Sequence, residues 1–146
     1  MSAIGRRRGF TLVELMMAIG IFVLIVGLSV PVGLNFYLSY QFDSESDLLT
    51  ALLRQARNLS MVNHNESDHG LYITASQFTV FEGASYAARN QASDKQFPRD
   101  GAIAITGPTE TIFAALSGQT ASSTFNLNDG RKSRDIFVNP EGLIYE

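Results

Sequence analysis

The feature that most constrains this chain is an apolar run of 19 residues near its N-terminus, Phe10–Leu28, which carries a single charge at Glu14. At about 1.5 Å per residue, a helix of this length spans roughly 29 Å, close to the thickness of a bilayer's hydrocarbon core. Three arginines precede the run, at Arg6, Arg7 and Arg8, and such residues stay on the cytoplasmic side of a membrane. The run therefore predicts a single-pass membrane helix with a cytoplasmic N-terminus.

Composition limits what the rest of the chain can be. The 146 residues suit one domain plus an N-terminal segment. The formal net charge is −3. Without the three arginines that precede the apolar run, the chain has 8 basic and 14 acidic residues, a net charge of −6. This balance argues against general nucleic-acid binding. The chain has no cysteine, which excludes a disulfide scaffold and thiolate metal sites.

Three interpretations compete for the N-terminal segment. A secretory signal has a shorter apolar run, of about 7–15 residues, and a small-residue cleavage site that residues 29–32 lack. A plain membrane anchor has no use for Glu14, because a carboxylate inside the bilayer costs about 2.5–3.5 kcal/mol on insertion scales. The third interpretation, a processed signal, uses both the glycine that precedes the run and the glutamate within it.

The stretch Gly9-Phe10-Thr11-Leu12-Val13-Glu14 closely resembles the class III signal of type IV pilins and type II secretion pseudopilins. The resemblance implies that prepilin peptidase, a membrane enzyme, cuts between Gly9 and Phe10 and methylates the new N-terminus. Phe10 would become the first mature residue and Glu14 the fifth. Pro31 adds to the likeness, because many pilins have a proline at the equivalent offset.

Glu14 then acquires a physical role. Cleavage would create a cationic amine at Phe10, and Glu14 lies four residues on, one helical turn away on the same face. In a fibre, the amine of one subunit would meet Glu14 of its neighbour. Because such a pair is shielded from water, it would help to fix the register between subunits.

Pro31 lacks a backbone donor and clashes with the preceding helical turn, so we expect a kink or a locally melted stretch around residues 27–33. The alternative is that Pro31 ends the membrane helix. The expected organisation is a leader peptide, a transmembrane and assembly helix, its amphipathic continuation and a β-rich globular head: residues 1–9, 10–34, 35–62 and 63–146.

Residues 43–62 predict an amphipathic helix. Apolar side chains recur at helical spacing on one side, which predicts a face that packs on a sheet: Leu48, Leu49, Leu52, Leu53, Ala56 and Leu59. The sequence allows this helix to continue from the membrane segment. Alternatively, the acidic cluster Asp43–Asp47 starts a separate helix, with Ser44 or Ser46 as its N-cap.

A polar break follows at residues 63–70, where four side chains offer metal-ligating atoms: His64, Glu66, Asp68 and His69. No helical or strand spacing holds them on one face, and loops are commonly this polar. The sequence therefore predicts no metal site here and no cofactor elsewhere.

The remaining residues predict short strands, rich in β-branched and aromatic residues and separated by turn residues: Leu71–Thr74, Gln77–Glu82, Ala102–Thr106, Thr111–Leu116, Ser123–Leu127, Asp135–Val138 and Leu143–Tyr145. The stretch Gly83–Gly101 lacks periodicity and predicts a long surface loop. The fold class is thus α+β, a long N-terminal helix packed on a small antiparallel sheet of the pilin type. The strand order and the closing segment, residues 125–144, are similar to the heads of H-type minor pseudopilins and FimT-like minor pilins.

Arg131, Lys132 and Arg134 place three cations in a turn between two expected strands. Some FimT-like minor pilins bind DNA through a Gly-Arg-x-Arg element in this region, whereas here two residues separate Arg131 from Arg134. Three cations would contact a few phosphates in a weak, salt-sensitive manner. The alternative is a solvated hairpin turn whose arginines pair with Asp129 and Asp135.

No catalytic constellation is recognisable, so we expect a protein that is not an enzyme. The resemblance implies a structural subunit, a minor pilin or pseudopilin, of a type IV pilus or a type II secretion pseudopilus. The implied partners are the inner membrane, prepilin peptidase, an assembly platform and other subunits, of the same or another kind. The chain would sit in the inner membrane before assembly and afterwards in a periplasmic or extracellular fibre. The alternative function is DNA or surface binding through the turn at residues 130–134.

Overall fold

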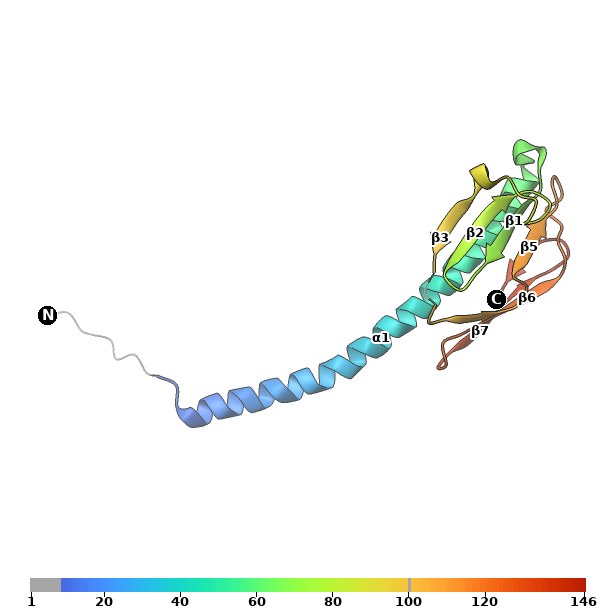
Figure 1. The fold of residues 1–146 in the computed structure, drawn as a ribbon. Coiled ribbons are helices and arrows are strands. Elements are labelled where there is room, and N and C mark those ends of the chain that lie inside the picture. Colours follow the sequence, from blue (N-terminus) through green and yellow to red (C-terminus); the bar gives the residue numbers. More distant parts are fainter. Residues whose placement is uncertain (1–8, 100) are drawn as a thin grey trace. The chain divides into compact units, whose positions relative to one another are not determined.

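The computed structural model describes residues 9–99 and 101–146, and at residues 29–32 it describes the backbone only. One long helix, α1 (Leu12–Met61), accounts for most of the N-terminal part. The chain divides into two compact units, residues 1–40 and residues 41–146. The second unit, called the head from here on, contains the last turns of α1 and all the strands (Figure 1).

The strands of the head form two four-stranded antiparallel sheets, with the orders β3-β2-β1-β5 and β4-β6-β7-β8. Two short 3-10 helices, η1 and η2, lie in the connections before β1 and before β3. In chain order the bounds are η1 His64–Glu66, β1 His69–Ile73, β2 Gln77–Glu82, η2 Gln91–Ser93, β3 Lys95–Pro98, β4 Ala104–Thr106, β5 Glu110–Phe113, β6 Ser123–Asn128, β7 Ser133–Val138 and β8 Ile144–Tyr145.

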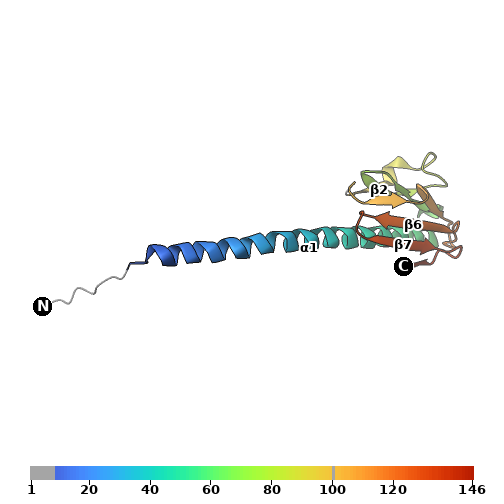
Figure 2. The same cartoon turned by 90° about the horizontal axis from the view of Figure 1, so that it is seen from below.

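The part of α1 inside the head buries one face against both sheets (Figures 1 and 2). The buried helix positions recur every three or four residues, as one stripe of a helix requires: Phe42, Glu45, Ser46, Leu49, Thr50, Leu52, Leu53, Ala56 and Ser60. They meet apolar side chains of both sheets in one continuous core, including Leu71, Phe78, Phe113, Phe125, Leu127, Ile136 and Val138. Each large apolar side chain buried there contributes about 1.5–3 kcal/mol.

The expected fold class, one long N-terminal helix packed on a small antiparallel head, is confirmed. The expected strand at residues 77–82 matches β2, and the other expected strands overlap observed ones. The prediction of a long loop over Gly83–Gly101 is wrong in part, because that stretch contains η2 and β3. The strand β3 was missed because it lies at a sheet edge and buries no residue fully, so its sequence shows no alternation. Pro98 at its end suits such an edge.

The alternative of a separate helix beginning at Asp43–Asp47 is wrong, because α1 runs through these residues without interruption. The acidic side chains act as partners for the head instead of as a helix start. Glu45 forms an ion pair with Arg99 at 2.8 Å, and Asp43 forms one with Arg134 at 2.9 Å. Ser46 is buried within the helix.

Candidate processing and assembly site

The predicted cleavage site lies just before the first turn of α1. Phe10 is 85% exposed, and the helix begins two residues later, at Leu12. Gly9 and Phe10 are both in extended or irregular backbone outside the helix. The bond between them is therefore in the part of the chain that a peptidase can reach without first unwinding a helix.

Thr11 and Glu14 cap the helix reciprocally. The Thr11 hydroxyl accepts a hydrogen bond from the backbone N–H of Glu14 at 3.2 Å. In return, Oε2 of Glu14 accepts one from the backbone N–H of Thr11 at 3.4 Å. This is the capping-box arrangement, which satisfies two backbone donors that a helix start leaves without partners. Glu14 therefore fixes where α1 begins, two residues after Phe10.

The apolar segment that follows has no core of its own. From Leu12 to Leu28 the large apolar side chains are exposed, from 43% at Val26 to 74% at Leu12. By length and composition, this part of α1 is long and apolar enough to cross a membrane. In water so much exposed apolar surface would be strongly unfavourable, so the segment requires lipid or other protein chains around it.

Residues 4–30 match the prokaryotic N-terminal methylation motif. The chain carries the signal of a type IV pilin-like precursor. The match supports processing by prepilin peptidase and assembly with other pilin subunits, and together with the apolar helix it is consistent with anchoring in the inner membrane before assembly. No curated protein and no solved structure matches the chain.

The roles of the other N-terminal residues stay predictions. Arg6, Arg7 and Arg8 fall within the matched motif, but they lie outside the residues that the structure describes. The backbone of α1 is helical through residues 27–33, whereas the side chain of Pro31 lies outside the described residues. The expected kink at Pro31 is thus not tested here.

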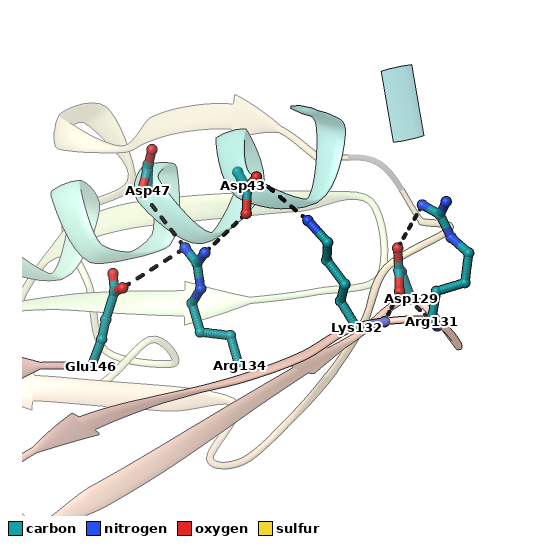
Figure 3. Close-up of polar contacts among 7 residues, drawn as sticks. All are labelled: Asp43, Asp47, Asp129, Arg131, Lys132, Arg134 and Glu146. Atoms are coloured by element: carbon teal, nitrogen blue, oxygen red, sulfur yellow. Dashed lines mark hydrogen bonds and ion pairs between the residues drawn. The ribbon is translucent and has the colours of Figure 1, made fainter. Parts of the chain in front are cut away.

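The three cations of the basic turn are engaged with carboxylates within the head (Figure 3). Arg131 pairs with Asp129 at 3.0 Å. Lys132 and Arg134 both reach Asp43 on α1, at 3.8 Å and 2.9 Å.

Arg134 is the most heavily engaged of the three. Its other nitrogen, Nη1, lies 4.0 Å from Asp47 and 3.8 Å from Glu146, and its guanidinium lies 5.8 Å from the centre of the Phe42 ring. Arg134 therefore links β7 to α1 through ion pairs. A DNA phosphate that bound Arg134 would have to displace those carboxylates. The predicted partner Asp129 is confirmed for Arg131, whereas Asp135 accepts a hydrogen bond from Asn126 instead.

Asp129 organises the turn itself. Its Oδ1 accepts hydrogen bonds from the backbone N–H groups of Lys132 and Arg131, at 2.6 Å and 2.8 Å. These bonds, that of Lys132 first, favour the charged carboxylate and hold the pKa of Asp129 below its ordinary value. Gly130, with φ +82°, takes the left-handed conformation that the turn requires. The turn is thus held by its own hydrogen bonds and by its ion pairs.

The four candidate metal ligands of residues 63–70 do not form one cluster. Asp68 caps a neighbouring loop, because its Oδ1 accepts a hydrogen bond from the backbone of Ala115 at 2.7 Å. Glu66 is exposed and lies outside the cluster that the two histidines form. His64 and His69 lie together, with ring centres 5.6 Å apart, and the carboxylate beside them is Glu82 of β2.

Two site residues were missed at the sequence level although signals for them exist. The pattern Thr11-x-x-Glu14 before an apolar run is a capping-box signature, which identifies Thr11 as the partner of Glu14. Glu82 stands at the end of a well-predicted strand, and its place beside His69 follows once the two strands are paired as a hairpin.

Proposed function

We propose that this chain is a structural subunit, a minor pilin or a minor pseudopilin, that assembles through α1 into a type IV pilus or a type II secretion pseudopilus. The observation that carries the proposal is the exposed apolar segment Leu12–Leu28, which lies within the match to the methylation motif and whose helix start is capped by Thr11 and Glu14. A segment of this kind is stable in lipid before assembly and among the same helices of neighbouring subunits afterwards.

The proposed role is not enzymatic. In assembly, the methylated amine at Phe10 of one subunit pairs with Glu14 of its neighbour while α1 leaves the membrane for the fibre core. The head, which closes its own hydrophobic core, stays in solvent and decorates the periplasmic or extracellular fibre. The proposed partners are prepilin peptidase, an assembly platform and other subunits of the same or another kind.

DNA binding by the basic turn finds no specific support, because Arg131, Lys132 and Arg134 all have carboxylate partners. The pair of Arg131 with Asp129 is the one that the sequence offered for a solvated hairpin turn, whereas Arg134 pairs with Asp43 and not with Asp135. We therefore put forward the structural role as the single proposed function.

Two substitutions separate the assembly role of Glu14 from its capping role. Glu14→Gln removes the charge but keeps an oxygen that accepts a capping hydrogen bond, since a capping box takes glutamate or glutamine. Thr11→Val removes the hydroxyl that caps Glu14 and leaves the charge in place. The amount of each variant is measured by immunoblot in sheared surface fibres and in membranes.

The proposal expects Glu14→Gln to accumulate in membranes and to be lost from the sheared fraction, while Thr11→Val still enters fibres. If Glu14→Gln enters fibres as the native chain does, charge pairing does not guide assembly. If Thr11→Val is lost from fibres while Glu14→Gln enters them, the role of Glu14 is to cap the helix.

A further inference from the structure

Three side chains of the head bring potential metal-ligating atoms close together. One ligand atom each from His64, His69 and Glu82 lies within 4.8 Å of the other two. His64 belongs to η1, His69 opens β1, and Glu82 closes β2. The three ligands thus come from separate elements that the chain brings together immediately after α1.

The sheet register fixes two of the three ligands. His69 and Glu82 stand directly opposite each other in the antiparallel pair of β1 and β2. The neighbouring residues make the flanking backbone bond, in which Gly83 donates to the carbonyl of Asp68 at 2.8 Å. This marks His69 and Glu82 as a non-hydrogen-bonded pair, the kind in which opposed side chains lie closest. Their proximity is therefore a property of the fold.

The third ligand is brought in by a strained turn. Asn63, Asn65 and Glu66 all have positive φ, near +52° to +55°, which is uncommon for residues other than glycine. This backbone folds the chain back after α1, so that His64 meets the ring of His69 edge to face. Such strain persists only where surrounding contacts maintain it.

The imidazole of His69 is buried and incompletely hydrogen-bonded. The residue is 3% exposed, and its Nδ1 atom is buried without a hydrogen-bond partner among the described residues. A buried polar atom without a partner is unfavourable, and coordination to a metal ion would supply one.

Hydrogen bonding orients the carboxylate of Glu82. Asn65 donates a hydrogen bond to its Oε2 at 2.8 Å. Hydrogen bonds of this kind orient a metal ligand and set its basicity.

A small cavity of about 50 Å³ lies among the three side chains, which leaves room for an ion with a coordinated water. Lys95 also lines this cavity, and its positive charge opposes a bound cation.

From this geometry we propose that His64, His69 and Glu82 bind a zinc ion, with a water completing a tetrahedral site. Two imidazoles and a carboxylate are ligands that zinc takes in proteins. Around such an ion, ligand atoms at about 2.0–2.1 Å lie roughly 3.4 Å apart. His64 is exposed, so its side chain is free to close the remaining distance. The ion fastens the turn that follows α1 to the β1–β2 hairpin.

Zinc titration by calorimetry tests the site on the full chain in detergent micelles, after removal of metal with EDTA. The native protein is expected to bind one ion per chain in the head. His64→Ala and Glu82→Gln should each weaken binding by about tenfold or more. Glu66→Gln is the matched control, because it makes the same chemical change at an exposed glutamate outside the cluster and should leave binding unchanged.

Circular dichroism checks that each variant is folded, and the exposed position of His64 makes its variant the safer one to interpret. Lys95→Gln, which removes the opposing charge, is expected to tighten binding. Binding by His64→Ala and Glu82→Gln that equals native binding would overturn the proposal, as would the absence of zinc binding by the native chain. The three side chains would then be in packing contact only.

Discussion

The helix α1 contains two segments that are built for different surroundings. Between residues 12 and 28 its large apolar side chains are exposed, and Phe22 for example is 67% exposed. Between residues 42 and 60 a single stripe is apolar and buried, and Phe42 is 1% exposed. The first segment depends on lipid or on other subunits, whereas the second depends on the head of its own chain. The helix α1 thus combines a segment that needs lipid or other chains around it with a segment that packs on the head of its own chain.

The two glutamates on α1 make the same contrast. Glu14 is exposed, and it exchanges two hydrogen bonds with Thr11 at the start of the helix. Glu45 is buried and holds Arg99 at 2.8 Å with both side chains at most 6% exposed. Glu45 is thus paired within its own chain, whereas the proposed partner of Glu14 is the N-terminal amine of another subunit. Substitutions can therefore address either half separately.

The largest effect is expected from paired phenylalanine truncations. Phe78→Ala empties a fully buried position of the head, and truncations of this kind cost about 3–5 kcal/mol. Phe22→Ala removes an exposed ring, so the free energy of unfolding of the head should change by less than about 0.5 kcal/mol. Urea unfolding in detergent, followed by near-ultraviolet circular dichroism, measures both. A comparable loss in the two variants would break the division between the segments.

Removal of the buried arginine is the next largest effect. Arg99 binds Glu45 and donates to the carbonyls of Thr74, at 2.9 Å, and Ile103. Arg99→Ala leaves a buried carboxylate without its guanidinium, which costs about 3 kcal/mol or more. Arg54→Ala is the control, because Arg54 lies on the exposed side of the same helix and should change the unfolding free energy little. Equal effects of the two would mean that the Arg99 pair does not stabilise the head.

The smallest effect concerns acid stability. Because the pKa of Asp129 is lower in the folded head than in the unfolded chain, the unfolded chain binds more protons in acid. The contribution of Asp129 is therefore present above the ordinary pKa of aspartate and is lost as the pH falls through the lowered value. Asp129→Asn lacks this dependence, so its unfolding midpoint should fall less steeply between neutral pH and pH of about 3. Parallel acid profiles for both chains would contradict the role of Asp129.

Sequence periodicity predicted the elements of this protein better than their contacts. The buried stripe of α1 and the strand β2 follow from spacing alone, because burial on one face imposes that spacing. The strand β3 was not predictable in that way, since an exposed edge strand imposes no alternation.

The contacts of the site depend on pairings across long stretches of chain. Arg134 meets Asp43, which lies 91 residues earlier, and no local pattern encodes that distance. Glu82 joins His69 only through the register of a hairpin. By contrast, the cleavage motif and the capping box are local sequence patterns, so the N-terminal site could be proposed without a structure.

The most direct test of the account is mass spectrometry of the protein's N-terminus, made separately on sheared surface material and on membranes. The account predicts a chain that begins at a methylated Phe10 in the sheared material, because residues 4–30 match the methylation motif and the resemblance to the class III signal implies cleavage after Gly9. A chain that keeps Met1–Gly9 and occurs only in membranes of cells with active prepilin peptidase would contradict it. The protein would then be a simple anchored domain.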